Sequence, residues 1–174
     1  MKDKINKYVI KLKQGDTSAF DKIYEETNKG VYFMALSVLK DRGLAEEIMQ
    51  ETYIRLLKNI NSFDENKNAV NWLLTISKNL AINLYNQKKR EIVAEPSTIL
   101  PERSYEMAND GSLIELALKN LKEVEFQILM LCEIKGYKRR EVAEMLDMPI
   151  GTVTWHYNQA LKKLKEILIK EENR

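Results

Sequence analysis

Residues 141–165 read EVAEMLDMPIGTVTWHYNQALKKLK, and this stretch holds two helical patterns separated by a break. Val142, Ala143 and Leu146 form one short apolar face, and Pro149 then prevents the same helix from continuing because proline lacks a backbone N–H. A longer apolar stripe at three-to-four spacing follows the break: Ile150, Val153, Tyr157, Leu161 and Leu164. Two helices joined by a tight turn predict a helix-turn-helix, whose second helix enters the DNA major groove.

The opposite face of the second helix is polar and mostly neutral. Asparagine and glutamine can pair with adenine edges, and threonine methyls can contact thymine methyls. A plain helical hairpin with a solvated outer face fits the same spacing, so the spacing alone leaves both interpretations open. The residues of this face are Thr154, Trp155, Asn158, Gln159, Lys162 and Lys163.

Composition places the chain among ordinary globular proteins. Hydrophobic residues make up 44% and charged residues 31% of the 174 residues. No apolar run approaches the roughly 18 residues that span a bilayer, and the N-terminus lacks the apolar core of a signal peptide, so we expect a cytoplasmic protein. A single histidine and a single cysteine cannot supply the four ligands of a common zinc site, and Cys132 is expected to be a buried small hydrophobe.

Helical periodicity extends over most of the chain, and no stretch shows the alternation of a β-hairpin. The predicted fold is therefore all-α, with two small helical domains joined by a flexible linker: residues 1–90, a linker over 91–111, and residues 112–174. The linker contains Pro96 and Pro101 and few packing residues, so we expect the two halves to move independently. Gly30 interrupts a helical pattern and marks a candidate kink.

Residues 66–90 contain no aspartate or glutamate, although the chain has 26 acidic residues elsewhere. The same segment contains Lys67, Lys78, Lys88, Lys89 and Arg90. A local positive field of this kind suits a phosphate backbone.

The two halves of the sequence carry a resemblance to one family. The stretch GYKRREVAEMLDMPIGTVTWHYNQALKKLKEIL resembles region 4 of the extracytoplasmic-function (ECF) class of bacterial RNA polymerase sigma factors, although many response-regulator output domains look similar. Upstream, GDTSAFDKIYEE, DRGLAEEIMQETYIRLLKNINSFD and AVNWLLTISKNLAINLYNQKKR resemble successive blocks of region 2. The order of the blocks favours the sigma factor, and the short linker leaves no room for the region 3 of primary sigma factors.

The resemblance implies a surface that binds core RNA polymerase at the beta-prime clamp. An acidic patch with apolar neighbours fits a partner with basic residues, whereas the residues alone would also fit a solvated helix face. The residues implied are Glu46, Glu47, Gln50, Glu51, Tyr53 and Leu57.

The resemblance also implies that the third block and the loop before it open the −10 promoter element and hold a flipped base. Loop candidates are Phe63, Asp64, Asn66, Lys67 and Asn68, and helix candidates are Lys78, Asn79, Asn83, Lys88, Lys89 and Arg90. Trp72 shares a stripe with Ile76 and Leu80, which favours a core position over a base-stacking one.

For the −35 element, the sequence departs from the family pattern because the reading helix lacks the usual basic residues. Positive charge instead lies on the preceding helix and at the far end of the reading helix, which predicts a basic frame around a neutral reading face and an A·T-rich element. The candidates are Lys138, Arg139, Arg140, Thr152, Thr154, Trp155, His156, Asn158, Gln159, Lys162 and Lys163. We expect His156 to be a packed side chain and not a pH switch.

The sequence therefore predicts a sigma factor that is not an enzyme, with no catalytic residues, no metal and no cofactor. Its implied partners are core RNA polymerase (beta-prime clamp region and beta flap), promoter DNA and an anti-sigma factor, with no membrane insertion of this chain. Two alternatives remain open at this stage: a stand-alone helix-turn-helix regulator with an N-terminal interaction domain, and a polymerase-binding protein with weak DNA contact.

Overall fold

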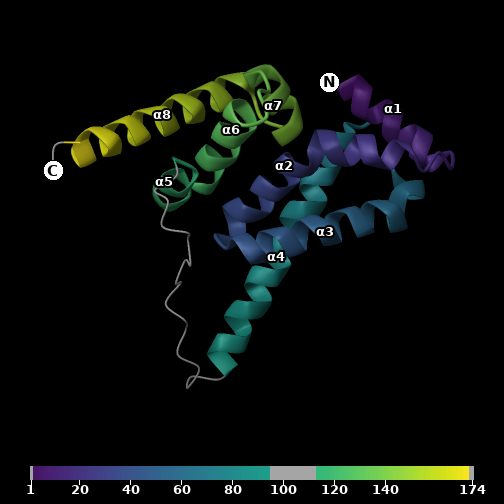
Figure 1. The fold of residues 1–174 in the computed structure, drawn as a ribbon, viewed down its shortest axis with the longest axis horizontal. Coiled ribbons are helices and arrows are strands. Elements are labelled where there is room, and N and C mark those ends of the chain that lie inside the picture. The colour runs from purple at the N-terminus through teal and green to yellow at the C-terminus, as the bar shows by residue number, and fades with distance from the viewer. Residues whose placement is uncertain (1, 95–112, 173–174) are drawn as a thin grey trace.

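The computed structural model describes residues 2–94 and 113–172, and the regular structure of these residues is entirely helical (Figure 1). The N-terminal half contains α1 (Lys2–Lys13), α2 (Ala19–Leu39), α3 (Arg42–Asn59), the short 3₁₀ helix η1 (Ile60–Ser62) and α4 (Ala69–Ala94). The C-terminal half contains α5 (Leu113–Asn120), α6 (Glu123–Glu133), α7 (Arg139–Leu146) and α8 (Ile150–Glu172). The all-α prediction is confirmed. The predicted linker 91–111 begins inside α4, and the rest of it lies outside the described residues.

Local sequence signals set the helix boundaries. Asp41 precedes α3, and its side chain accepts the Leu44 backbone N–H at 2.9 Å. The turn predicted between the last two long patterns is present: α7 ends at Leu146 and α8 begins at Ile150, directly after Pro149. The helix-turn-helix geometry therefore follows from a proline that cannot continue one helix and readily precedes the next.

Gly30 lies inside α2, which runs without a break from Ala19 to Leu39, so the kink expected there is not found. The glycine instead lies where another helix comes close. A Cβ atom at this position would lie 3.5 Å from Cδ2 of Leu131 in α6 and 3.8 Å from Cδ2 of Leu74 in α4. A small residue thus allows a helix of the C-terminal half to approach α2.

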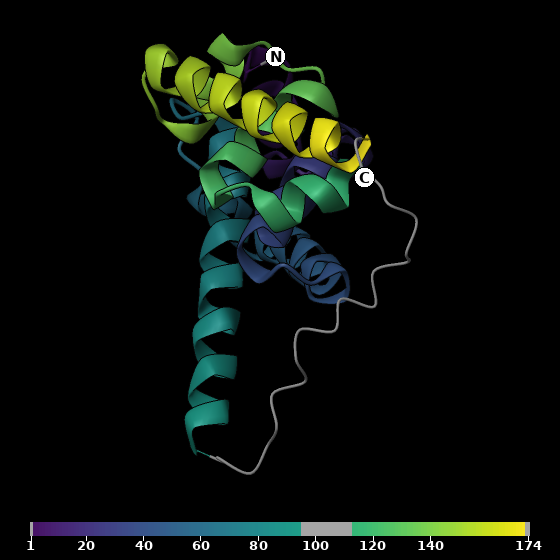
Figure 2. The ribbon, with the colours of Figure 1, turned by 90° about the vertical axis from the view of Figure 1, so that its left-hand side faces the viewer.

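The two halves pack against each other, and the expectation that they move independently is not met in this structure. Helix α2 contacts α6, and α4 contacts α7. Both hydrophobic clusters of the core combine residues from the two halves: Val31, Met34 and Leu74 with Ile128, Leu131 and Val142 in one, and Phe33, Leu36 and Ala81 with Leu118, Phe126 and Met130 in the other. Figure 2 shows that the C-terminal part of α4 projects from this shared body.

Candidate polymerase- and DNA-binding surfaces

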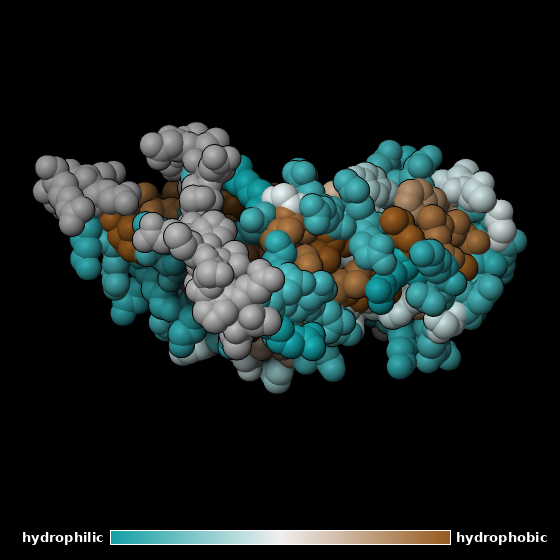
Figure 3. All heavy atoms as spheres, turned by 90° about the horizontal axis from the view of Figure 1, so that it is seen from below, coloured by the Kyte–Doolittle hydropathy of each residue, from teal (hydrophilic) through white to brown (hydrophobic). Residues whose placement is uncertain are grey.

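Helix α3 presents an acidic face with apolar neighbours. Glu46, Glu47 and Gln50 are exposed, as the sequence analysis required of a polymerase-binding surface. Leu57 is 47% exposed, and the sequence analysis missed its neighbour Ile54, which is 44% exposed. Figure 3 shows that apolar side chains form several patches among hydrophilic ones on the face seen from below. In the sequence, Ile54 stands three residues before Leu57, and this helical spacing could have placed it on the same face.

Two residues predicted for this face are engaged within the protein. Tyr53 is only 4% exposed, and its hydroxyl lies 2.8 Å from the Thr27 hydroxyl oxygen. Burial raises the pKa of Tyr53, and its ring packs against Tyr24 at a centroid distance of 4.9 Å. Glu51 is half-buried and accepts a hydrogen bond from Arg55 Nε at 3.0 Å. Tyr53 therefore packs in the core beneath the exposed face of α3, which corrects its assignment as a polymerase-contacting residue.

The loop before α4 is shaped by its own polar side chains. Asp64 Oδ1 accepts the backbone N–H of Asn66 at 3.0 Å. Asn68 Oδ1 accepts the N–H groups of Val70 and Asn71 at 2.9 and 3.2 Å, which caps the first turn of α4. Asp64, Asn66 and Lys67 are exposed, so the loop offers polar side chains to solvent in a fixed backbone.

Phe63 does not join this exposed set. It is 3% exposed, and its ring lies 5.0 Å from that of Trp72 at an interplanar angle of 36°. Both rings belong to one hydrophobic cluster, as predicted for Trp72. The assignment of Phe63 as a base-contacting residue is therefore wrong for this structure, because its side chain anchors the start of the loop in the core.

Helix α1 holds the same loop in place, through residues that the sequence analysis missed. Asn6 Oδ1 accepts the N–H of Ala69 at 2.9 Å, and Asn6 Nδ2 donates to the carbonyl of Lys67 at 2.6 Å. Lys13 Nζ donates to the carbonyl of Phe63 at 3.1 Å. These contacts join residues 50 to 63 positions apart, so no local pattern could have revealed them.

Helix α4 carries its candidate DNA contacts on two adjacent stripes. One stripe, at helical spacing, contains Asn79, Asn83, Asn86 and Arg90, all of which are exposed. The other contains Lys78, Ile82, Tyr85 and Lys89, of which Ile82 and Tyr85 are exposed apolar residues that the sequence analysis did not single out. Lys88 is exposed as well. The exposed surface of the projecting end of α4 is therefore mostly polar and basic, with Tyr85 as an exposed aromatic side chain.

On α8, the polar face predicted to read DNA is open to solvent. Trp155 is 56% exposed and Asn158 is exposed, whereas Thr152, Thr154 and Gln159 are half-buried. Ile150 is 52% exposed, although its place in the apolar stripe predicted an inward position. Leu161, from the same stripe, is also exposed. The face toward solvent is thus more apolar than predicted.

Two residues predicted for this face point elsewhere. His156 is half-buried, as expected, and its Nδ1 atom is buried without a hydrogen-bond partner. Lys163 Nζ donates to both carboxylate oxygens of the buried Glu125 at 2.7 Å. Burial alone would raise the pKa of Glu125, but the hydrogen bonds from Lys163 and from the Lys122 backbone N–H outweigh it and lower that pKa. Lys163 therefore joins α8 to α6, and Lys162 is the exposed cation of this turn.

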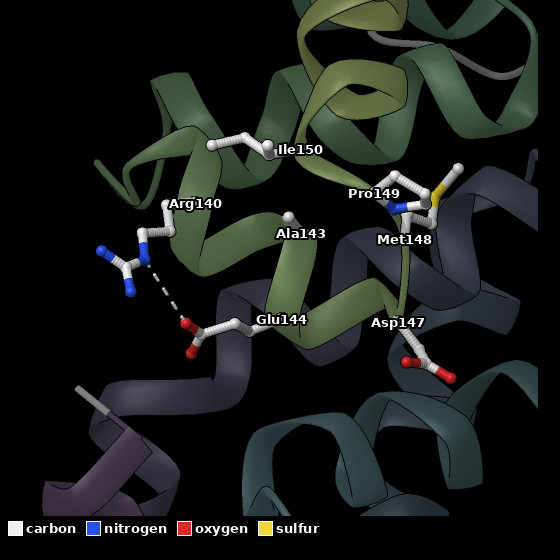
Figure 4. A pocket seen from close by; sticks show the side chains of 7 residues that line it. All are labelled: Arg140, Ala143, Glu144, Asp147, Met148, Pro149 and Ile150. Carbon is white, nitrogen blue, oxygen red and sulfur yellow. Dashed lines mark ion pairs between the residues drawn. The ribbon is translucent and has the colours of Figure 1, made fainter.

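The basic residues before the reading helix are exposed and stand at the start of α7. The guanidinium of Arg139 lies 5.4 Å from the centroid of the Tyr157 ring, and Arg140 pairs with Glu144 at 3.8 Å. Figure 4 shows Arg140 and Glu144 on one side of α7, at a shallow hollow that Ile150 also lines. Lys138 is exposed at the N-terminal end of α7. Exposed cations therefore lie at the start of α7, and Arg139 reaches α8 at Tyr157.

The geometry agrees with the comparisons to known proteins. Residues 23–91 match the family description of Sigma-70 region 2, and residues 112–164 match that of Sigma-70, region 4. The chain is 28% identical to the ECF RNA polymerase sigma factor SigW of Bacillus subtilis, over 94% of this chain and 96% of that protein. It is 27% identical to the ECF RNA polymerase sigma factor SigK of Mycobacterium tuberculosis, over 88% of this chain and 87% of that protein.

Two solved structures show the same fold. The sigma factor RpoE, in complex with the anti-sigma factor NepR from Bartonella quintana, aligns with a TM-score of 0.64 and 22% identity over 86% of this chain and 96% of that one. CnrH, in complex with the cytosolic domain of CnrY, aligns with a TM-score of 0.66 and 17% identity over 95% of this chain and 97% of that one. Within the described ranges, the structure contains neither a helix suited to crossing a membrane nor a cluster of side chains suited to holding a metal ion.

Proposed function

We propose, for a chain that belongs to the sigma-70 family of bacterial RNA polymerase sigma factors and to its ECF class, that it binds core RNA polymerase and directs the enzyme to promoters. In this role the N-terminal half binds polymerase and the −10 element, and the C-terminal half binds the −35 element. The chain contributes recognition and melting, and the polymerase contributes the chemistry of RNA synthesis.

The observation that carries this proposal is the presence, in one chain, of three distinct surfaces in the order the family requires. An acidic and apolar face on α3 precedes an acid-free basic segment on α4, and a helix-turn-helix with an exposed reading face follows. A stand-alone regulator would need only the last of these surfaces. The conjunction of all three supports the sigma factor.

The α3 surface is proposed to bind the beta-prime clamp of the polymerase. Glu46, Glu47 and Gln50 supply negative charge and hydrogen-bonding groups, while Ile54 and Leu57 supply exposed apolar area on the following turns. Charged groups of this kind mainly steer association and fix its register, whereas apolar residues that become buried contribute more of the affinity. We therefore expect the apolar pair to matter as much as the acids.

The loop before α4 and the exposed stripes of α4 are proposed to open the −10 element. Unstacking a base costs a few kcal/mol, which contacts from the loop must offset. Asn66 and Lys67 are exposed on a backbone that Asn6 and Asp64 hold in one shape. A preformed loop loses little conformational entropy when it binds, so more of its contact energy is available for the flipped base.

The reading face of α8 is proposed to select an A·T-rich −35 element. Asn158 and Gln159 can pair with adenine, and the exposed apolar side chains of Ile150 and Trp155 can contact thymine methyl groups. The cations at the start of α7 and Lys162 would contact phosphates and position the helix without specifying sequence. Unchanged promoter preference in a Gln159→Ala variant would count against this assignment.

An anti-sigma factor is proposed as the third partner, because one of the solved structures with this fold holds the sigma factor RpoE in complex with the anti-sigma factor NepR. The beta flap is the expected polymerase contact of the C-terminal half. A protein that binds core polymerase and promoter DNA would act in the cytoplasm, and we propose that location for this chain.

Capture of bacterial core RNA polymerase by the purified full chain tests the proposal. We expect the wild-type chain to retain polymerase, a Gln50→Ala/Glu51→Ala double variant to lose it, and a Lys7→Ala variant on the exposed surface of α1 to behave as the wild type. Failure of the correctly folded wild-type chain to retain polymerase would refute the proposal and favour the stand-alone helix-turn-helix regulator.

A further inference from the structure

Three helices of the C-terminal half, α6, α7 and α8, contact one another, and they meet at the side chain of Tyr157 in α8. The Tyr157 hydroxyl donates to Oε1 of Glu133, the last residue of α6, at 2.6 Å. The guanidinium carbon of Arg139, the first residue of α7, lies over the Tyr157 ring at 5.4 Å from its centroid. Tyr157 is half-buried and packs against both hydrophobic clusters. The tyrosine therefore contacts a carboxylate through its hydroxyl and a cation through its ring.

The bond to Glu133 fixes the orientation of the Tyr157 ring. A distance of 2.6 Å is typical of a hydroxyl that donates to a carboxylate, and such bonds are stronger than those between neutral groups. The hydrogen bond to Glu133, together with burial, raises the pKa of Tyr157 to about 12, so the hydroxyl keeps the proton that it donates at neutral pH. The ring is thus held in one place relative to α6.

Arg139 keeps its hydrogen-bonding groups available. Its neighbour Arg140 pairs with Glu144 at 3.8 Å, whereas the guanidinium of Arg139 forms neither an ion pair nor a hydrogen bond with any residue in the described ranges. A guanidinium carries a planar fork of N–H donors, and contact with the face of a ring leaves these donors able to bind another group. Because Arg139 is also exposed, an anion in solution can reach them.

The place of Arg139 in the motif suits a contact with the DNA backbone. In a helix-turn-helix the first helix crosses the backbone while the second enters the major groove, and Arg139 begins the first helix. Tyr157 follows Thr154 of the reading face by about one turn of α8, so its ring lies at the border between that face and the core. A guanidinium held over this ring is therefore next to the reading face, at the edge where a bound duplex has its phosphates.

We infer that Tyr157 is a positioning residue for Arg139: its ring holds the guanidinium in place to bind a phosphate of the promoter, and Glu133 holds the ring. The inference rests on the proposed function. A free arginine side chain has many rotamers, and binding a phosphate costs the freedom that it then loses. A ring that already restrains the guanidinium removes part of this cost and leaves the N–H groups for the paired bonds that arginine makes with a phosphate. Tyr157 thus raises the affinity for DNA without contacting DNA itself.

A double-mutant cycle separates this role from a purely structural one. Tyr157→Leu removes the ring but keeps an apolar side chain, and Tyr157→Phe keeps the ring but loses the bond to Glu133. Each variant is combined with Arg139→Ala and, as the matched comparison, with Arg140→Ala, because Arg140 is the adjacent exposed arginine and pairs with Glu144 instead. Affinity is measured as a function of salt for the full chain bound to core polymerase. The probe is a promoter duplex that the wild-type complex selects from a random pool.

We expect Arg139→Ala to reduce the salt slope by about one and the affinity on the order of tenfold. Tyr157→Leu should weaken binding about two- to fivefold, since restraint adds no more to affinity than one exposed cation–π contact is worth. Tyr157→Leu should have no further effect once residue 139 is alanine, and it should keep its full effect beside Arg140→Ala. Tyr157→Phe should weaken binding less than Tyr157→Leu, because the ring remains.

Two results of the cycle would overturn the inference. An equal loss of affinity for Tyr157→Leu with and without Arg139 would show a general effect on the fold of the C-terminal half. A Tyr157→Phe variant as weak as Tyr157→Leu would show that the hydroxyl, and not the ring, is decisive. Normal capture of core polymerase without any coupling between Tyr157 and Arg139 would likewise overturn the role in DNA binding.

A failure of the proposed function gives a different result. If the folded wild-type chain fails to capture core polymerase, the sigma-factor assignment falls, and the promoter contact of Arg139 falls with it. Restraint is measured separately on the free chain, from the NMR order parameter of the Arg139 Nε–H bond. We expect this order parameter to fall in Tyr157→Leu. The same low value in the wild type and in Tyr157→Leu would refute the restraint whatever the polymerase result.

Discussion

Replacing Lys163 separates a structural lysine from a DNA-binding one on the same turn of α8. Lys163 binds both oxygens of the buried Glu125, whereas Lys162 is exposed at the next position. We expect Lys163→Met to destabilise the C-terminal half and to change promoter affinity little. Lys162→Met should lower promoter affinity and change the stability of the C-terminal half little.

The size of the effect follows from the geometry of the pair. Hydrogen bonds to charged groups contribute about 1.5–3 kcal/mol each, and the Glu125 carboxylate keeps only the Lys122 backbone N–H once the ammonium is removed. Because the Lys163 side chain is 35% exposed, water replaces part of the loss. We therefore expect a loss of about 2 kcal/mol in the free energy of unfolding, which is about 4–8 °C in Tm for a chain of this length.

The pH dependence gives the sign of the interaction. A carboxyl group whose pKa is lowered by folding stabilises the fold above its unfolded pKa, about 4.3 for glutamate, and loses this contribution as pH falls through the folded value. Without Lys163 burial disfavours the Glu125 carboxylate, so the penalty of Lys163→Met should be full at neutral pH and should already be smaller when the pH has fallen to about 4.

Urea unfolding at pH 7 and near pH 4 measures the stability of each variant. The salt dependence of promoter affinity, measured with the chain bound to core polymerase, gives the contribution of each lysine to DNA binding. Lys162→Met should keep its stability within about 0.5 kcal/mol and reduce the salt slope by about one. The reasoning is refuted if Lys163→Met unfolds like wild type at neutral pH, or if its stability penalty is the same at both pH values.

Three further outcomes are expected from single substitutions. Asn6→Ala should slow −10 melting, measured by permanganate reactivity of promoter thymines, and should cost about 1 kcal/mol of stability because it releases the loop before α4; unchanged melting kinetics would contradict the role given to α1. Tyr53→Phe should lower stability by about 1 kcal/mol, through the lost hydrogen bond to Thr27, without weakening polymerase capture, whereas Leu57→Ala should weaken capture at unchanged stability; the opposite pairing of effects would restore Tyr53 to the contact surface. Trp155→Ala should reduce the affinity difference between −35 elements containing thymine and deoxyuracil, measured by fluorescence anisotropy, and an undiminished difference would argue against methyl contact by this side chain.

The helices were readable from sequence because their inward faces follow helical spacing. Ile48, Thr52 and Leu56, which recur every four residues along α3, are all buried. The stripe of α8 was only partly correct. Val153 of the predicted stripe is buried, whereas Ile150, at the start of the helix, and Leu161 are exposed. Ala160, the residue next to Leu161, is buried although it was not part of the predicted stripe. Apolar character alone did not distinguish a core position from an exposed one near a helix end.

The sequence predicted the exposure of a candidate residue correctly where its own helix determines it, and less well where a neighbouring helix packs against it. Asn158 and Gln50 are solvent-accessible as expected, because polar residues on a single amphipathic helix face outward. Tyr53, Phe63 and Lys163 were assigned to surfaces by residue type, but each has a partner on another helix: Thr27, Trp72 and Glu125. An aromatic or a long cation fits both a core edge and a binding face, so only the position of the neighbouring helix decides between them.

Gly30 is the residue in α2 whose type reflects the interface between the halves, but the sequence alone could not show why a glycine stands there. A glycine inside a helix lowers helix stability by roughly 1 kcal/mol relative to alanine, so Gly30 requires a reason. A bend in the helix and the close approach of another helix both favour a glycine, so the residue type does not distinguish between them. The distinction comes from Leu131, a hundred positions away, whose side chain occupies the space beside the glycine. Gly30→Ala should therefore be tolerated, because a Cβ at 3.5 Å makes an ordinary contact, whereas a branched side chain there would force α6 away from α2 and open the chain.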